Sequence, residues 1–158
     1  MPLADLTLDT NVLLHSCNPI EGRHAASIEF LQCLLGCSTK LAIDEGFSLD
    51  PALNRSLIGG EYLAKIVPGT LPSAVLTQLA LTGRVTTFKS SVNAQDAKKL
   101  NQMVANRRDR TFIKVCANSV GRVLVSHDFD DFPPPKRKEL GKIFALELLE
   151  AMHCRVRL

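Results

Sequence analysis

Acidic side chains directly follow two of the most apolar stretches of the sequence. Asp9 comes after residues 6–8, and Asp128 comes after residues 123–126 with a single residue between. Both stretches are short and apolar, which is typical of buried strands in a parallel sheet. The carboxyl ends of parallel strands lie at one edge of the sheet, where open α/β proteins bind their ligands. We therefore expect Asp9 and Asp128 to converge if their strands are neighbours.

Two more acids are expected at the same edge. Asp131 follows Asp128 by three residues, and Asp109 lies near the start of a helix that leads into the same strand. Carboxylates that converge without paired arginines repel one another, and Mg²⁺ or Mn²⁺ relieves this because both ions prefer oxygen ligands. Such a metal activates water and stabilises charge on a phosphoryl oxygen, which is the chemistry of phosphodiester hydrolysis. The alternative is that Asp9 and Asp109 only cap helices.

Other catalytic patterns are missing from the sequence. It contains no phosphate-binding GxxxxGK[ST] or GxGxxG loop and no recognisable Ser/His/Asp spacing. A phosphoryl-transfer domain with Asp9 as the nucleophile is disfavoured, because Asn11 stands where such phosphatases place a second acid. His127 is expected to point away from Ser126 and Asp128 on a strand, which favours a packing role over catalysis.

Strands and helices are expected to alternate along the whole chain. Strands are predicted at residues 6–8, 40–43, 84–88, 123–126 and 154–158, and helices at 25–36, 61–66, 72–81, 94–104, from Asp109 onward, and at 136–150. Residues 46–60 are expected to form a loop around a short helix. The alternation predicts an α/β fold, with a mostly parallel sheet that is covered by helices on both faces.

The composition favours one globular domain over residues 1–158. The chain is 46% hydrophobic, and no stretch approaches the roughly 20 apolar residues of a membrane span. The N-terminus lacks the basic start and apolar run of a secretory signal. Five cysteines form no CxxC pair, and Cys33 and Cys37 are expected to be buried thiols on an apolar helix face. A reducing, cytoplasmic location without membrane contact is therefore expected.

The charge is unevenly distributed. Residues 1–50 carry two basic and seven acidic side chains, whereas residues 84–142 carry thirteen basic and six acidic ones. Such a basic half suits a polyanion, although a solvated surface also tolerates the imbalance. Aromatic residues make up only 5% of the chain, so base-stacking platforms are not evident. The basic side chains close to the expected acidic edge, which we assign to RNA phosphates, are Arg107, Arg108, Arg110, Lys136 and Arg137. Lys136 and Arg137 also fit the solvated first turn of a helix.

Two blocks of the sequence resemble a known family. Residues 8–14 (LDTNVLL) resemble the opening of PIN domains, and residues 109–117 (DRTFIKVCA) and 123–132 (VLVSHDFDDF) resemble their closing half. The blocks cover about a quarter of the chain and lie in the family's order. The resemblance implies a three-layer α/β/α sandwich around about five parallel strands. It also implies an acidic Mg²⁺ or Mn²⁺ pocket and endonuclease activity, usually on RNA.

The resemblance assigns roles to individual residues. Asp9, Asp109 and Asp128 match the family's catalytic, metal-binding acids, and Asp131 stands where a further acid sometimes occurs. Ser126 occupies a position that is usually Thr, and its hydroxyl could hold a carboxylate or a metal-bound water.

Asn11 could act like Ser126. The family's remaining acid lies in the poorly matched middle, where Glu61 is our prediction and Glu45 and Asp50 are alternatives. If none of these three reaches the pocket, only three strong acids remain and catalysis is in doubt.

The implied partners follow from the same resemblance. RNA is the expected substrate, and a toxin of a toxin–antitoxin pair would also have an inhibitory antitoxin-like protein. The alternative function is a catalytically degenerate PIN-fold module that binds RNA or protein and keeps the acids as caps. A homodimer through the predicted edge strand at 154–158 and the helix before it is also plausible.

Overall fold

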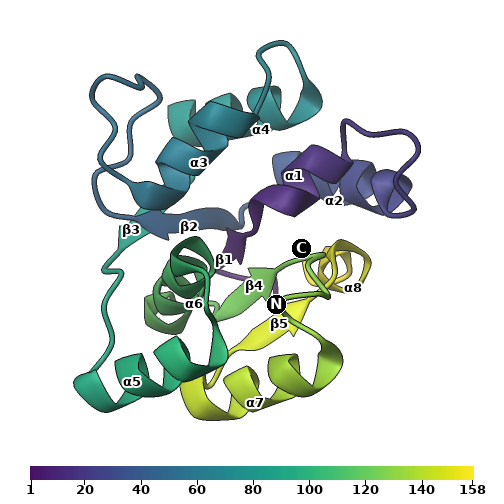
Figure 1. Ribbon diagram of the computed structural model, residues 1–158. Helices are drawn as coiled ribbons and strands as arrows, with labels where there is room; N and C mark the ends of the chain where they lie inside the picture. The colour runs from purple at the N-terminus through teal and green to yellow at the C-terminus, as the bar shows by residue number, and fades with distance from the viewer.

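The computed structural model describes residues 1–158 and contains one five-stranded sheet (Figure 1). The strands are all parallel and lie in the order β3-β2-β1-β4-β5. They are β1 (Asp5–Leu8), β2 (Lys40–Asp44), β3 (Val85–Phe88), β4 (Val123–Val125) and β5 (Glu147–Leu149). The predicted α/β fold with helices flanking a parallel sheet is therefore confirmed.

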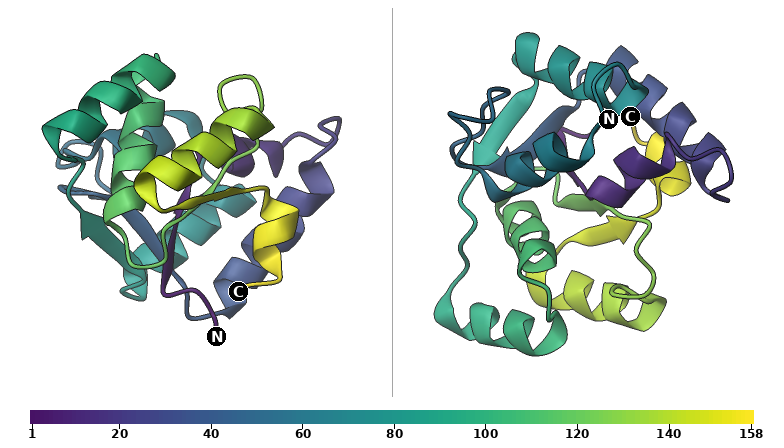
Figure 2. Two further views of the ribbon diagram at one scale, coloured as in Figure 1. Left: turned by 90° about the horizontal axis from the view of Figure 1, so that it is seen from below. Right: turned by 45° about the horizontal axis from the view of Figure 1, so that its top comes forward.

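Eight helices surround the sheet. They are α1 (Thr10–His15), α2 (His24–Gly36), α3 (Leu57–Lys65), α4 (Leu71–Leu81), α5 (Ala94–Met103), α6 (Arg107–Asn118), α7 (Pro134–Phe144) and α8 (Ala151–Arg155). Helix α2 packs against α4 and α8, whereas α6 packs on β1, β2 and β4. Figure 2 shows these two groups on opposite sides of the sheet. None of the helices combines the length and the apolar character that crossing a membrane requires.

The chain order changes direction between β1 and β4. From β1 the chain builds the sheet outward through β2 and β3, and it then returns to add β4 and β5 on the other side of β1. Leu8 pairs with Val125, and the Asp9 N–H donates to the Val125 carbonyl over 2.9 Å. Ligands of open α/β sheets bind at such a switch point. The fold therefore places Asp9 beside the loop that follows β4.

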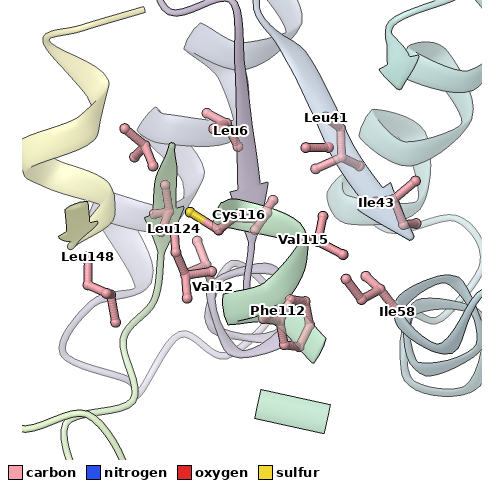
Figure 3. Packing of buried hydrophobic residues seen from close by; sticks show 14 of the residues in the cluster. Leu6, Val12, Leu41, Ile43, Ile58, Phe112, Val115, Cys116, Leu124 and Leu148 are labelled. Carbon is pink, nitrogen blue, oxygen red and sulfur yellow. The ribbon is translucent and has the colours of Figure 1, made fainter. Parts of the chain in front are cut away.

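The core between the sheet and α6 fixes the position of that helix (Figure 3). Phe112, Val115 and Cys116 face the strands, and each is at most 1% exposed. Leu124 is fully buried on the same face of the sheet, because its partner in the β1–β4 pairing is Thr7, which contacts Cys116. Leu6 is also fully buried but faces the other side of the sheet. Because α6 is anchored along its length, its first turn is held at the carboxyl edge of the sheet.

The C-terminal part of the chain differs from the prediction. The predicted helix at 136–150 stops at Phe144, because Ala145 adopts a left-handed conformation (φ 52°) and its N–H donates to Gly141. Residues 147–149 then form β5, and the predicted edge strand at 154–158 is wrong because α8 covers Ala151–Arg155. The apolar band of the predicted helix is too broad for one helix face, since Leu148 is buried as a residue of β5 and Leu146 is buried just before that strand. The dimer proposed through that edge strand loses its basis.

The middle of the chain also differs in detail. Helix α3 begins at Leu57 rather than at Glu61, because the Ser56 hydroxyl accepts a hydrogen bond from the Gly59 N–H and caps the first turn. Two glycines in that turn obscured the start, since glycine disfavours helix interiors. The expected burial of Cys33 and Cys37 is wrong as well: Cys33 is exposed and Cys37 is only half-buried.

Tyr62 ties α3 to the end of β1. Its ring is completely buried, and its hydroxyl donates to the Leu8 carbonyl, next to Asp9. We expect Tyr62→Phe to lower the free energy of unfolding by about 1–2 kcal/mol, because a buried acceptor loses its donor. Chemical denaturation of both proteins at the same pH measures this difference. An unchanged midpoint would show that the hydroxyl does not stabilise the strand end.

Candidate metal centre

Asp9 is the residue around which the acidic site is built. It lies between β1 and α1, is 6% exposed, and accepts hydrogen bonds from the Ser126 hydroxyl (2.7 Å) and the Asn11 N–H (3.4 Å). It therefore caps α1 and faces the site at the same time. Burial raises the pKa of Asp9 to about 6, while the hydrogen bonds from Ser126 and Asn11 lower it and the charges of Asp128 and Glu61 raise it further.

The loop after β4 carries two further acids. The Ser126 hydroxyl accepts a hydrogen bond from the Asp128 N–H over 3.1 Å, so it connects the first and last strand-end acids. The Asp128 Oδ1 accepts from the Asp131 N–H over 2.9 Å, which turns the chain back toward α6. Ser126 is fully buried and holds a carboxylate, one of the two roles expected for it.

Asp109 enters the site from the first turn of α6. Asn106 is the cap of this helix, since its side chain accepts from the Arg108 N–H over 2.9 Å. Asp109 is only 8% exposed, and its Oδ2 is buried without a hydrogen-bond partner. Burial raises the pKa of Asp109 to about 7, followed by the charge of Asp9 and a hydrogen bond with Asp131. Capping alone therefore does not account for this carboxylate.

Glu61 is the middle-region acid that reaches the site. Its Oε1 forms an ion pair with Lys65 (2.9 Å) and lies 4.0 Å from Arg108, while its Oε2 is buried without a partner. The two alternatives do not line the acidic cavity: Glu45 is exposed, and Asp50 accepts a hydrogen bond from the Ala52 N–H. The choice of Glu61 thus agrees with where the chain places it.

These side chains enclose a polar cavity of about 180 Å³, which we call the acidic cavity. One ligand oxygen from each of Asp109, Asp128 and Asp131 can be chosen so that all three lie within 4.8 Å of one another. Carboxylate oxygens at this spacing suit a hard divalent cation, and the partnerless oxygens of Asp109 and Glu61 suit it further. The residues therefore fit a metal ion. The cavity is lined by Asp9, Thr10, Asn11, Leu14, Glu61, Lys65, Asn106, Arg108, Asp109, Asp128 and Asp131.

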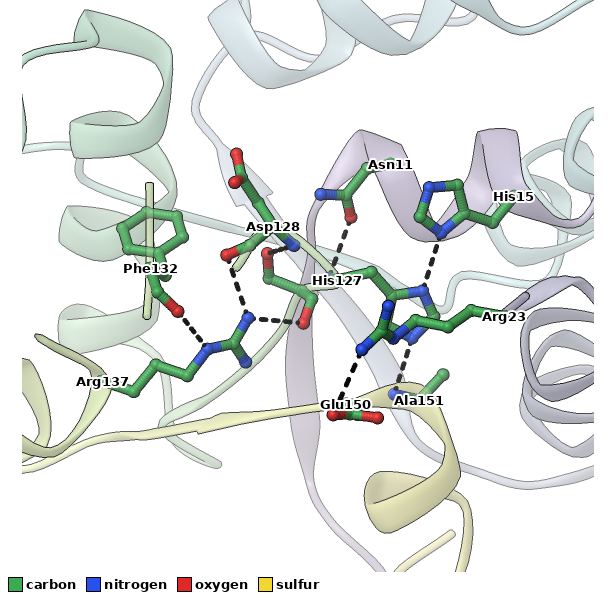
Figure 4. Close-up of polar contacts among 10 residues, drawn as sticks. Asn11, His15, Arg23, His127, Asp128, Phe132, Arg137, Glu150 and Ala151 are labelled. Atoms are coloured by element: carbon green, nitrogen blue, oxygen red, sulfur yellow. Dashed lines mark hydrogen bonds and ion pairs between the residues drawn. The ribbon is translucent and has the colours of Figure 1, made fainter. Parts of the chain in front are cut away.

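The basic residues predicted to bind RNA are not all free to do so. Arg108 lines the acidic cavity, and Arg107 and Arg110 line a neighbouring pocket. Lys136 lines neither of them. Arg137 donates instead to the backbone carbonyls of residues 126, 128 and 132, at 2.6–3.1 Å (Figure 4). Its guanidinium also stacks on the Phe129 ring. Arg137 therefore holds the loop that carries Asp128, and its assignment to substrate stays a prediction.

His127 follows β4 by two residues and is buried, in agreement with the packing role predicted for it. Its backbone N–H donates to the Asn11 side-chain oxygen over 3.1 Å, and its ring Nε2 accepts from the Ala151 N–H over 3.1 Å (Figure 4). Its Nδ1 meets the Nδ1 of His15 at 3.0 Å. Burial lowers the pKa of His127 to about 3, so the ring is neutral at physiological pH. The contact with His15 carried no sequence signal, because 112 residues separate the two rings.

We expect Asp109→Asn to stabilise the protein in EDTA at pH 8 by on the order of 1–3 kcal/mol. A raised carboxyl pKa means that the folded state holds its proton more tightly than the unfolded state. The contribution of the Asp109 carboxyl group to the free energy of unfolding is therefore most favourable below pH 4, and it is lost as the pH rises from about 3.8 to about 7. Asparagine cannot ionise, so it removes this loss.

Thermal unfolding of wild type and Asp109→Asn at pH 4 and pH 8 measures this effect. The variant should melt at a higher temperature only at pH 8, and adding Mn²⁺ should stabilise wild type but not the variant. Asp130→Asn is the matched control, because Asp130 is exposed and does not line the cavity. A variant that is less stable than wild type at pH 8 would contradict the unfavourable ionisation of Asp109.

Comparisons of the chain with models of known families, with curated proteins and with solved structures find no match. The parallel five-stranded fold is compatible with Rossmann-like and PIN-like folds. A function therefore has to be argued from the site itself.

Proposed function

We propose that the protein is a metal-dependent endoribonuclease of PIN type, with the acidic cavity as its active site. The observation that carries the proposal is the convergence of Asp9, Glu61, Asp109, Asp128 and Asp131 from four separate segments at the sheet's switch point. Two of their buried oxygens have no partner within the chain. Five acids are more than helix caps require.

The chain's own residues would divide the work in the following way. Asp109, Asp128 and Asp131 would hold Mg²⁺ or Mn²⁺, with Asp9 behind them. The bound ion would supply an activated water and would stabilise charge on a phosphoryl oxygen. The Oε2 of Glu61 would accept a proton from water, because the ion pair with Lys65 occupies only the Oε1. Arg108 at the rim would contact the phosphate.

The experiment that tests this function is cleavage of an internally labelled single-stranded RNA pool. We expect internal cuts in Mn²⁺ or Mg²⁺ and none in EDTA. Asp128→Asn protein purified in parallel reveals any copurifying nuclease. Cleavage that persists in EDTA or in the variant would overturn the proposal. Intact RNA together with salt-sensitive RNA binding would favour a non-cleaving binding module.

A further inference from the structure

A second polar cavity, larger than the acidic cavity and lined by basic residues, lies near it. It measures about 520 Å³, compared with about 180 Å³ for the acidic cavity, and falls in the size range of ligand pockets. It opens beyond the ends of β2 and β3, between residues 54–57, Ser90, Asn101 and one face of α6. We call it the basic pocket.

The charge of the basic pocket is not balanced within the chain. Its cations are Arg55, Arg107, Arg110 and Lys114, and none of them forms an ion pair with another side chain. Arg110 is oriented by its hydrogen bonds to the carbonyls of residues 104 and 105, at 3.0 and 2.6 Å. Four cations without an acidic partner around a polar hollow favour an anion.

The single acid of the basic pocket is already occupied. Asp44 accepts hydrogen bonds from the Ser56 hydroxyl, from the Leu57 N–H (2.7 Å) and from the Ile58 N–H (3.0 Å). It therefore stabilises the first turn of α3 and neutralises none of the four cations by direct contact. The pocket also offers only one hydrophobic residue, which excludes an apolar ligand.

A third cavity connects the basic pocket with the acidic cavity. It measures about 310 Å³ and shares Glu61, Lys65 and Arg108 with the acidic cavity and Ser56 and Leu57 with the basic pocket. Helix α6 borders both ends: Arg107, Arg110 and Lys114 recur at positions i, i+3 and i+7 on one face, and Asp109 lies on another. A polymer with repeating phosphates can occupy both ends at once.

We propose that the basic pocket binds a backbone phosphate of the RNA strand whose scissile phosphate lies in the acidic cavity. Arg55 and Lys114 provide charge from two separate segments, and Ser90 and Asn101 offer hydrogen bonds to the sugar–phosphate backbone. The inference rests on the proposed function for the identity of the strand. Binding at the basic pocket itself does not require a divalent metal.

The test is fluorescence anisotropy with a labelled single-stranded RNA in EDTA, titrated at several salt concentrations. We expect Arg55→Gln and Lys114→Gln each to weaken binding about 3- to 10-fold at low salt. Each change should also reduce the slope of log affinity against log salt by about 0.7, and the double variant by about twice that. Lys142→Gln is the control, because Lys142 is exposed and lies outside the pocket.

The outcomes separate this inference from the proposed nuclease function. Weaker binding by the two variants without any cleavage by wild type would retain the basic pocket and reject the nuclease. A second outcome is that wild type cleaves RNA while Arg55→Gln and Lys114→Gln have the same RNA affinity and salt slope as Lys142→Gln. This outcome would reject the basic pocket and retain the nuclease. The inference is also overturned if wild type does not bind RNA in EDTA at low salt. Inorganic phosphate that stabilises wild type but not Arg55→Gln, with RNA binding unchanged, would assign a free-anion site instead.

Discussion

Asp128→Asn is expected to lower the rate of RNA cleavage by about 10²- to 10³-fold, since the loss of several kcal/mol of charge stabilisation corresponds to such a factor. Asp128 contributes one of the three closely spaced ligand oxygens and joins Ser126 to Asp131 through hydrogen bonds. Asparagine keeps the size and the acceptor oxygen of the side chain. The expected loss therefore comes from the charge rather than from the loop's conformation.

Asp130→Asn provides the matched control for this prediction. It removes the same charge from the same loop, but Asp130 is exposed and lines no part of the acidic cavity. Initial rates of cleavage at saturating Mn²⁺ should be near wild type for Asp130→Asn. Equal losses in the two variants would show that the loop's net charge, and not a ligand at position 128, controls the reaction.

Metal binding by the same variants gives an independent readout. We expect Mn²⁺ to raise the melting temperature of wild type and of Asp130→Asn, and to raise that of Asp128→Asn much less. This measurement does not depend on the correct RNA substrate. If wild type shows no stabilisation by Mn²⁺ or Mg²⁺, the acids do not form a metal site.

The sequence predicted the acidic edge well because its signal is local. A short apolar run followed by a carboxylate is visible in the chain, and parallel pairing then places all such ends on one edge. Asp9 and Asp128 lie near each other because β1 and β4 are neighbours in the sheet. The alternation of strands and helices in the sequence is consistent with this strand order but does not determine it. The choice of Glu61 over Glu45 depended on the resemblance, and the start of α3 was still misplaced.

The features that the sequence did not predict depend on distant contacts. Residues 136–150 are apolar enough for one long helix, and only pairing with β4 draws residues 147–149 into a strand. The basic pocket combines residues from five separate segments. Two of these residues, Arg55 and Ser90, belong to no recognisable sequence motif. Arg137 looked like a cation for RNA because its sequence neighbours are basic, whereas its real partners are backbone carbonyls.

Replacement of Arg137 is expected to destabilise the loop after β4, which carries Asp128 and Asp131. Its guanidinium donates three hydrogen bonds, to the carbonyls of residues 126, 128 and 132, and stacks on Phe129. Arg137→Ala leaves these carbonyls without their donor, and we expect the free energy of unfolding to fall by about 2–3 kcal/mol. Lysine lacks the planar fork that reaches several acceptors, so Arg137→Lys should restore little.

The metal dependence of cleavage distinguishes a positioning role from a substrate contact. If Arg137 positions the loop, the variants should need about 10- to 100-fold more Mn²⁺ for half-maximal activity, and excess Mn²⁺ should restore part of the rate. A higher KM for RNA at unchanged Mn²⁺ dependence would instead return Arg137 to the phosphate-binding residues. Lys138→Ala is the control, because Lys138 is exposed on the same turn of α7. The acidic cavity would then depend on a cation that contacts the backbone carbonyl of Asp128 and not the metal-binding oxygens, because the carbonyls that Arg137 binds orient the Asp128 side chain.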